Sequence, residues 1–523
     1  MAQKWWTLTA VVTGVFMLVL DITIVNVALP YIGLDFHSPL SDLQWVIDAY
    51  ALALAAGLLT GGSLGDLWGR RRLYAVGTAI FTVGSLLCGL ATGPLFLSIA
   101  RAGQGIGGAV VWATSLALLG DAFRGRDRGT AFGVYGGILG IAAAVGPLLG
   151  GVLTSGLSWR WIFWVNVPVG IVVIIVTLTK LRESSNPAAS RPDWLGFLTF
   201  GGALGLLIYG LIGSADGWAE PEVYGSLIAA GVLLALFLVL EFRQKRPMLD
   251  MRLFRKPTFT GGLIAAFGLN ASVYSLFPYL VLYLQQQLGQ SAAQAGVRFL
   301  ALTAAMFVAS TVAGRLTSAV PVRLMIGGGF VLIGAGILLM YGLTSSSDWT
   351  DLLPGMIVTG AGAGLVTVPL ASTAVGVVDV SQAGMASGIN ATARQVGIAT
   401  GIAALGAIFT SQLRDTAADH LRDTPLAAQA QRIADGMGAS TGPGDASLAG
   451  LPATAAELVD QAARTGFIDG LNLILVIGAA VAFVSALFSL VLIRRRDFVP
   501  PPVTPATAPA PAAAASAAEA HGS

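Results

Sequence analysis

Residues 7–28 form an apolar segment that is long enough to cross a bilayer as a helix and that contains one carboxylate, Asp21. Because a helix rises about 1.5 Å per residue, Asp21 lies roughly 10 Å inside the Ala28 end of this segment. A charged side chain at that depth costs ~2.5 to 3.5 kcal/mol even on the lenient insertion scale. Asp21 is therefore expected to be protonatable, paired or exposed to water, as in a proton or cation site. The alternative is an acid that caps the helix or reaches the interface near the helix end.

The composition places Asp21 in a protein with many membrane spans. Of 523 residues, 55% are apolar and 11% are charged, which is far outside the range of soluble domains. The net charge of +2 gives no basic excess that would suggest nucleic acid as a partner. The single cysteine, Cys88, excludes a disulfide framework and a thiolate metal site. We therefore expect no metal, no cofactor and no redox chemistry. The expected energy source is a proton gradient, because Asp21 is a candidate proton site.

Apolar segments of membrane-spanning length recur along the whole chain, and no strand-like alternation competes with them. Fourteen segments are found, at 7–28, 45–64, 73–91, 95–119, 130–154, 161–180, 194–213, 222–241, 257–284, 292–313, 323–343, 352–375, 384–410 and 467–493. The fold class is therefore an all-α polytopic membrane protein, with its helices arranged as 6+2+6.

This order predicts an N-terminal six-helix bundle at 1–183, two inserted and peripheral helices at 194–241, and a C-terminal six-helix bundle at 257–496. Segment 411–466 is expected outside the membrane as a loose loop, with a short helical hairpin or a lid as alternatives. The Pro/Ala-rich tail at 497–523 is predicted to be disordered. Because the basic residues gather in alternate loops, the positive-inside rule places both termini in the cytoplasm. The protein is expected in the cell membrane of a prokaryote.

Two further charged residues fall near Asp21 when helix depth is counted. Arg101 lies on a descending span, roughly 10 Å below the same outer face as Asp21, so the two side chains are able to meet. An arginine within hydrogen-bond range favours an ionised carboxylate, whereas burial favours the protonated form, so a moving Arg101 would switch the proton on Asp21. Asp48 is shallower and is a candidate second carrier, a counter-ion for cationic substrates or an exposed acid at a helix start.

The loop between the second and third spans carries a dense charge cluster, which we call the gating loop. Its candidate residues are Gly62, Asp66, Gly69, Arg70 and Arg71. A weaker copy, which lacks the aspartate, joins the matching spans of the second half, as expected for two pseudo-repeated bundles around a midplane site. Asp66 is expected to bond a helix N-terminus or an arginine in a latch that breaks when the bundles rock. The arginines would also serve as topogenic charges.

These patterns resemble the motifs of the major facilitator superfamily. The gating loop resembles its G-x-L-A-D-R-x-G-R-R-R motif, with Gly65 and Leu67 in place of Ala and Arg. Residues 101–105 resemble the R-x-x-Q-G motif of the fourth helix. The G-P-x-x-G-G motif of the fifth helix, which marks antiporters, is matched by Gly146, Pro147, Gly150 and Gly151.

Fourteen spans, with further signatures at 20–30, 44–46 and 159–168, make the chain similar to the 14-helix drug:proton antiporter branch of this superfamily. The resemblance covers the first six spans densely and the second half more loosely. It implies proton-driven export of amphipathic small molecules by a protein that works as a monomer in the lipid bilayer. Pro147 among small residues also suggests a close helix packing with a hinge.

A substrate cavity is expected between the two bundles, near Asp21, Asp48 and Arg101. Its other candidate residues are Asn26, Trp45, Tyr50 and Trp112 in the first bundle and Asn270, Tyr274 and Arg394 in the second. Aromatic rings beside acids suit lipophilic cations, although such rings also occur facing lipid. Arg394 has no acid in its own bundle, and a backbone carbonyl, a substrate and an aspartate of the first bundle are alternative partners.

The chain is not expected to be an enzyme. It contains no His pair, no Cys cluster, no Gly-x-Ser-x-Gly elbow and no phosphate-binding Gly-x-x-x-x-Gly-Lys loop, and the last absence also argues against ATP-driven pumping. Proton-coupled uptake of a nutrient is the main rival, because a fold does not determine transport direction. Export of a self-made natural product or a lipid stays open.

Overall fold

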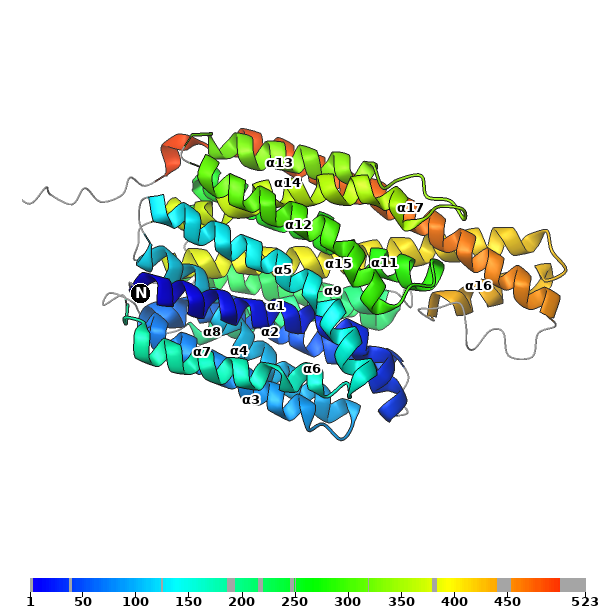
Figure 1. The fold of residues 1–523 in the computed structure, drawn as a ribbon, viewed down its shortest axis with the longest axis horizontal. Coiled ribbons are helices and arrows are strands. Elements are labelled where there is room, and N and C mark those ends of the chain that lie inside the picture. The colour runs from blue at the N-terminus through cyan, green and yellow to red at the C-terminus, as the bar shows by residue number, and fades with distance from the viewer. Residues whose placement is uncertain are drawn as a thin grey trace, which may run out of the picture.

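The structure is a computed structural model, and it describes residues 3–36, 40–123, 126–185, 193–214, 220–244, 249, 251–317, 319–378, 383–439 and 453–498. Within these residues the regular structure is entirely helical. The helices lie side by side along one direction (Figure 1). Residues 499–523 of the predicted tail lie outside the described part of the chain.

The first half of the chain forms a bundle in which α1 packs against α4, α5 and α7. Its helices are α1 (Gln3–Phe36), α2 (Leu40–Trp68), α3 (Arg70–Gly89), α4 (Pro94–Ala122), α5 (Arg126–Gly156), α6 (Trp161–Trp164) and α7 (Asn166–Lys180). The short α6 and the longer α7 together occupy the sixth expected span. Proline at the first position of α4 suits a helix start, since that position needs no backbone donor.

Two helices follow, α8 (Trp194–Gly213) and α9 (Pro221–Arg243), and they pack against each other. We expected them to be peripheral to both bundles. In the structure α8 also contacts α2 and α15, one helix from each half of the chain. Helix α8 therefore packs against both α2 and α15, which also contact each other.

The second half forms a bundle whose first expected span is interrupted. Its elements are η2 (Met251–Arg255), α10 (Pro257–Leu269), the π-helical turn η3 (Asn270–Tyr274), α11 (Phe277–Leu282), the π-helical turn η4 (Tyr283–Gln287), α12 (Ala292–Leu316), α13 (Val322–Leu338), α14 (Trp349–Gly376), α15 (Ala383–Arg422), η6 (Ala427–Gln429), α16 (Ala430–Ala439), α17 (Ala453–Leu492) and η7 (Arg495–Asp497). Wide turns of this kind often occur at functional positions.

The span expected at 323–343 ends earlier, because α13 stops at Leu338. Gly342 has a φ of +90°, a conformation that glycine adopts without strain. Asn472 of α17 then binds the chain, since its Oδ1 accepts from the backbone amides of Gly342 and Leu343 and its Nδ2 donates to the carbonyl of Leu343. These bonds satisfy backbone groups that a continuing helix would have paired.

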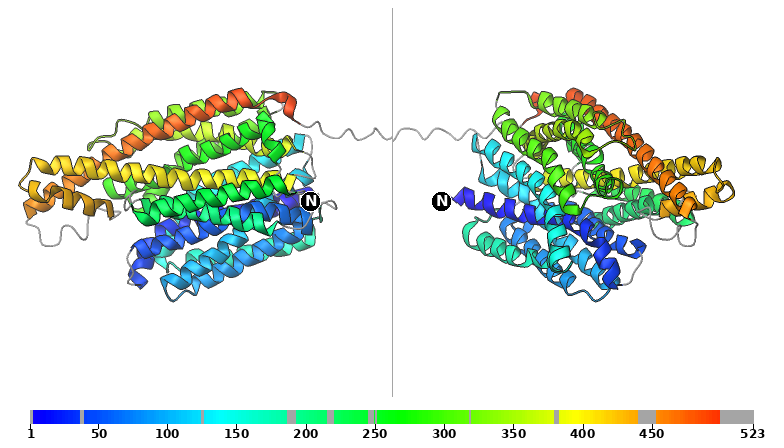
Figure 2. Two further views of the ribbon diagram at one scale, coloured as in Figure 1. Left: turned by 180° about the vertical axis from the view of Figure 1, so that it is seen from behind. Right: turned by 45° about the vertical axis from the view of Figure 1, so that its right-hand side comes forward.

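The halves meet mainly along α5 with α12 and α2 with α15, and α15 also packs against α4 (Figures 1 and 2). At the end that holds the N-terminus, a Cβ added to Gly129 of α5 would lie only 2.8 Å from the carbonyl oxygen of Gly314 in α12. On the other pair's side, Ser387 of α15 donates to the carbonyl of Ala113 in α4 at 3.0 Å. The two halves are therefore in close contact at this end of the molecule.

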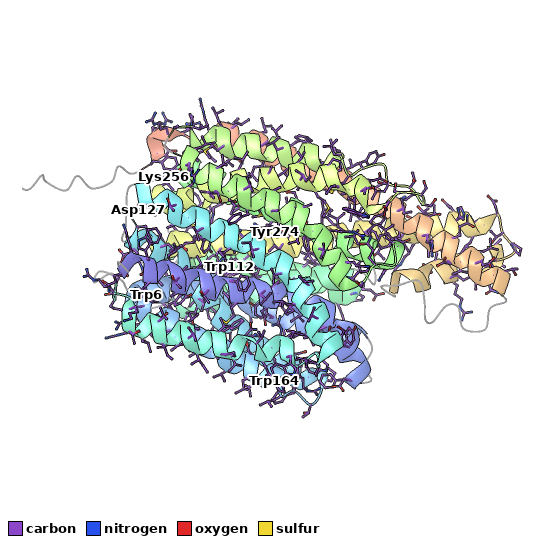
Figure 3. The ribbon with its side chains drawn as sticks, viewed as in Figure 1. Trp6, Trp112, Asp127, Trp164, Lys256 and Tyr274 are labelled. Atoms are coloured by element: carbon purple, nitrogen blue, oxygen red, sulfur yellow. The ribbon has the colours of Figure 1, made fainter. Side chains whose placement is uncertain are left out.

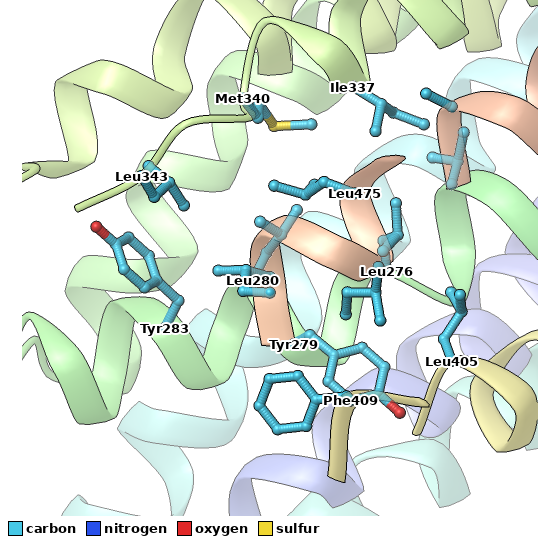
Figure 4. Packing of buried hydrophobic residues seen from close by; sticks show 14 of the residues in the cluster. Leu276, Tyr279, Leu280, Tyr283, Ile337, Met340, Leu343, Leu405, Phe409 and Leu475 are labelled. Carbon is cyan, nitrogen blue, oxygen red and sulfur yellow. The ribbon is translucent and has the colours of Figure 1, made fainter. Parts of the chain in front are cut away.

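The core of the second half connects its interrupted first span to two long helices. Figure 4 shows Leu276, Tyr279 and Leu280 packed against Phe409 and Leu475. Tyr279 also donates from its hydroxyl to the carbonyl of Ile402 at 3.0 Å. Apolar contacts thus connect η3 and α11 to the long helices α15 and α17.

The loose-loop expectation for 411–466 is wrong for its described part. Helix α15 continues to Arg422, α16 follows, and α17 begins at Ala453, so these helices project beyond the bundle at the right of Figure 1. Leu413, Ala417 and Leu421 recur every four residues and are buried together. This apolar stripe favours a packed helix over a loop.

Among the described residues, eleven helices are long and apolar enough to cross a membrane. Two shorter apolar helices, Trp45–Leu58 and Val322–Leu338, add to them. Each of the fourteen expected segments falls on one of the helices or interrupted helices given above. The polytopic all-α class is confirmed, whereas the count of fourteen spans and the domain boundaries stay predictions.

Candidate functional site

The carboxylate of Asp21 is paired inside the first bundle. Asp21 on α1 is 0% exposed and Arg101 on α4 is 1% exposed. The Nη1 of Arg101 donates to Oδ2 of Asp21 at 2.5 Å. The expectation that the two side chains meet at one depth is therefore confirmed, while their role in proton coupling stays a prediction.

Two amides complete the shell around Asp21, and sequence reasoning did not assign them to the site. Gln104 donates from Nε2 to Oδ1 of Asp21 at 2.9 Å, and Asn166 of α7 donates from Nδ2 to the same oxygen at 3.1 Å. The Oε1 of Gln104 accepts from Nη1 of Arg101 at 2.7 Å, and its Nε2 also donates to Ser85. Its spacing of three residues from Arg101 on one helix was the available signal.

Arg101 is held by a second helix of the bundle as well. Its Nε donates to the carbonyl of Val46 on α2 at 3.1 Å, and its Cζ lies 4.1 Å from the ring centroid of Tyr50. A guanidinium over an aromatic face is stabilised by the ring quadrupole. The charge pair therefore connects α1, α2, α4 and α7, and any movement of Arg101 has to break contacts with several of them.

The antiporter motif lies directly beside Asp21. A Cβ added to Gly146 of α5 would collide with the hydroxyl of Thr23, two residues after Asp21 on α1, and would lie 2.7 Å from the Thr23 Cβ. Gly150 is buried, and its carbonyl accepts a hydrogen bond from Thr154 on the same helix. The small residue at position 146 thus lets α5 approach α1 next to the charge pair.

Four candidate residues have side chains outside the described part of the chain: Asn26, Asp48, Asp66 and Pro147. Their predicted roles as a cavity residue, a second acid, a latch and a hinge stay predictions.

The described part of the gating loop is connected to an acid that the sequence analysis missed. Gly69 has a φ of +98° and precedes α3. The Oε1 of Glu183, which follows α7, accepts from the backbone amide of Arg71 at 3.0 Å, and its Oε2 lies 3.5 Å from Nε of Arg71 and of Arg72. The amide of Arg70 donates to the carbonyl of Ser184 at 2.8 Å. An acid in an otherwise basic loop was the signal for this contact.

Two further candidates are glycines away from the helix ends. Gly62 of the gating loop is buried within α2, and Gly151 of the antiporter motif is half-buried on α5, where its carbonyl accepts from Ser155.

The aromatic candidates of the first bundle differ in position. Trp45 is 43% exposed, and its ring centroid lies 5.8 Å from that of Tyr209 on α8, so it contacts the inserted helices. Tyr50 and Trp112 are buried, and the Oη of Tyr50 and the Nε1 of Trp112 have no hydrogen-bond partner among the described residues. Only these two therefore fit the expected interior position.

In the second half, Asn270, Tyr274 and Arg394 lie inside the molecule. Asn270 is buried, but its Nδ2 donates to the carbonyl of Ala266 on the same helix. The Oη of Tyr274 approaches the sulfur of Met306 at 4.0 Å. Figure 3 shows Trp112 and Tyr274 farther along the molecule than Asp127 and Lys256, which lie near the end that holds the N-terminus.

Arg394 is the one candidate whose partner the sequence left open. It is 5% exposed on α15 and forms no ion pair or side-chain hydrogen bond with the part of the chain that the structure describes. Its charge acts electrostatically on the phenols of Tyr135 on α5 and Tyr274 in η3. Among the described residues no aspartate of the first bundle is paired with Arg394, and Asp21 is bound by Arg101.

No group of three or more His, Cys, Asp or Glu side chains that could hold a metal ion is found in the described ranges.

Comparison with known proteins identifies relatives along nearly the whole chain. The family model of the Major Facilitator Superfamily matches residues 11–402. The multidrug resistance protein Stp of Mycobacterium tuberculosis is 36% identical over 417 residues, which cover 79% of this chain and 78% of that protein. The tetracenomycin C resistance and export protein of Streptomyces glaucescens is 33% identical over 502 residues, which cover 93% and 91%.

Solved structures with the same fold include two more distant proteins. The human organic anion transporter MFSD10 is similar with a TM-score of 0.60 at 13% identity, and the match covers 93% of this chain and 99% of that one. The proton:xylose symporter XylE matches with a TM-score of 0.60 at 12% identity, covering 94% and 96%. These likenesses show the fold.

Proposed function

This chain belongs to the major facilitator superfamily of membrane transporters, and from that premise we propose that it is a proton-coupled antiporter that exports amphipathic drugs or antibiotics. The observation that carries the proposal is the buried pair of Asp21 and Arg101. An ionisable carboxylate on a spanning helix is energetically costly, and such residues usually have a function in transport. An acid that is paired with a movable cation is suited to carrying a proton, because movement of the cation changes the affinity of the acid for the proton.

In the proposed cycle, Asp21 receives a proton from the outer side and loses its ion pair with Arg101. A neutral carboxyl no longer attracts the guanidinium, so Arg101 is free to move with α4. Loss of the proton to the cytoplasm restores the pair. The bonds from Gln104 and Asn166 hold the carboxyl in place during both steps, because an amide can donate to either form.

A route exists from this pair to the contact between the two halves. Gly146 brings α5 against α1 beside Asp21, and α5 packs along α12 of the second half. With the termini in the cytoplasm, the close contacts at Gly129 and Gly314 would close the cytoplasmic side in this conformation. Alternating access requires these contacts to open when the halves rock against each other.

The descriptions of the relatives support the proposed substrate class. They include proteins described as a multidrug resistance protein, a puromycin resistance protein and a probable actinorhodin transporter. We propose export of such compounds, self-made or foreign, across a bacterial cytoplasmic membrane by a monomer with no cofactor.

The test is transport into inverted membrane vesicles with an imposed pH gradient and a panel of dyes and antibiotics. The vesicle lumen then corresponds to the outside of the cell. An antiporter should accumulate the compound when the lumen is acidic, because protons leaving the lumen drive the exchange. Accumulation that instead follows the proton into right-side-out vesicles would indicate uptake by symport and would contradict the proposal.

A further inference from the structure

We propose that Arg394 and the polar aromatic groups beside it bind an anionic oxygen group, a carboxylate or phenolate, of an aromatic substrate. The proposal rests on the proposed export function and assigns the chemical class of its substrate. It differs from the expected preference for cations, which depended on acids beside aromatic rings.

The charge of Arg394 is not balanced within the described part of the chain. The buried charged side chains described there are Asp21, Arg70, Arg101, Glu241 and Arg394. Asp21 is bound by Arg101, and Glu241 accepts from the backbone amide of Leu249 at 3.0 Å. A buried cation without a counter-charge is unfavourable, and a negatively charged ligand removes that penalty when it binds.

Two buried polar groups near Arg394 have no hydrogen-bond partner among the described residues. They are the hydroxyl of Tyr135, which can donate or accept, and the indole N–H of Trp112. Ala391, one turn before Arg394, belongs to the same buried cluster as Trp112 and Tyr135. An indole N–H only donates, and an arginine only donates, so this set favours an acceptor-rich ligand.

One unpartnered acceptor lies nearby but faces elsewhere. The Oδ1 of Asn390 has no partner within the described residues. Asn390 instead lies against Phe259, Leu263 and Thr373 of the second half. We therefore assign this amide to contacts within the second half.

The position of Arg394 between the halves suits a substrate site. Of its two phenol neighbours, Tyr135 belongs to α5 in the first half and Tyr274 to η3 in the second. A ligand bound by both would contact both halves, which is where transporters of this architecture bind their substrates. Arg101 is already bound to Asp21, Gln104 and Val46 through its Nη1 and Nε. Arg101 would thus serve the proton site and Arg394 the substrate site.

The test measures binding to the purified full-length protein in detergent, without a pH gradient. The probes are anthraquinone-2-carboxylate and anthraquinone-2-carboxamide, which share size and aromatic area and differ in charge. Equilibrium dialysis gives the affinity for each probe. The variants are Arg394→Gln, Arg394→Lys and Tyr135→Phe, and the matched control is Arg464→Gln, which removes a charge that is 54% exposed on α17.

We expect the wild-type protein to bind the carboxylate more tightly than the carboxamide. Arg394→Gln should lower carboxylate affinity roughly tenfold or more, as for loss of a charge-assisted hydrogen bond, and should leave the carboxamide nearly unchanged. Arg394→Lys should retain part of the preference. Tyr135→Phe keeps the shape and should weaken the carboxylate alone, so it replaces Arg394→Gln if that variant does not fold. Arg464→Gln should match the wild type.

A wild-type protein that does not bind the carboxylate, or binds it no better than the carboxamide, overturns the proposal. So does an equal loss of both probes in Arg394→Gln. These outcomes are separate from proton coupling, which fails or succeeds in gradient-driven transport and not in this binding measurement.

Discussion

The guanidinium of Arg101 and the carboxylate of Asp21 lie 2.5 Å apart inside the protein, although 80 residues separate them in the chain. The carboxylate accepts from three side chains that come from two different helices, α4 and α7. An interior carboxylate with this many donors is held firmly in place, and a carboxylate is a group that can take up one proton, as a carrier must.

Asp21→Asn should leave the protein folded and able to bind substrate, because an amide can keep bonds to Gln104 and Asn166. It should abolish efflux driven by a pH gradient, since no proton is carried. The measurement compares gradient-driven transport with exchange of labelled substrate at equal pH. Asp35→Asn serves as the control, because Asp35 lies at the C-terminal end of the same helix and pairs with Arg160 at the surface. Full gradient-driven transport by Asp21→Asn would exclude Asp21 as the carrier.

Arg101→Gln should destabilise the protein by about 3 to 5 kcal/mol, because it leaves the Asp21 carboxylate buried without a counter-charge. Adding Asp21→Asn should restore a large part of the loss, since the unpaired charge is then gone. Thermal unfolding of the two single variants and the double variant gives the coupling between the residues. Additive effects would mean that the ion pair does not contribute to stability.

Gly146→Ala should disturb the contact of α5 with α1, because the new methyl group meets Thr23. Overpacking of this kind costs about 1 to 3 kcal/mol, and we expect slower transport along with a lower unfolding temperature. The control is Gly156→Ala at the end of the same helix, where an added Cβ meets nothing within 4 Å. Wild-type transport and stability in Gly146→Ala would show that α5 adjusts without consequence for the charge pair.

Glu183→Gln should loosen the gating loop without unfolding the protein. The ion pairs of Glu183 are partly exposed, so their loss should change stability by only about 0 to 1 kcal/mol. The amide of Arg71, which donates to Glu183, should exchange its hydrogen faster, and turnover should fall. Hydrogen exchange of residues 69–72 is the measurement, with Glu457→Gln on the projecting helix α17 as control. Unchanged exchange at Arg71 would remove Glu183 from the gating contact.

The sequence by itself determined the fold class, the family and the central acid. Hydropathy over about 20 residues is a local property, so the spans could be placed without any contact between them. The depth of Asp21 and of Arg101 follows from counting residues along each helix, and their pairing was therefore predictable. The close packing at Gly146 could also be expected, because a small residue permits approach wherever the neighbouring helix lies.

Tertiary structure alone decided which side chains meet across helices. Gln104 and Asn166 bind Asp21, and Glu183 binds Arg71, because each helix has a particular rotation and vertical offset relative to its neighbours. Depth along a helix is fixed by residue number, whereas rotation is set by the packing of the whole bundle. For the same reason the placement of Arg394 near Tyr135 of α5 and Tyr274 of η3 emerged only once all the helices were placed together.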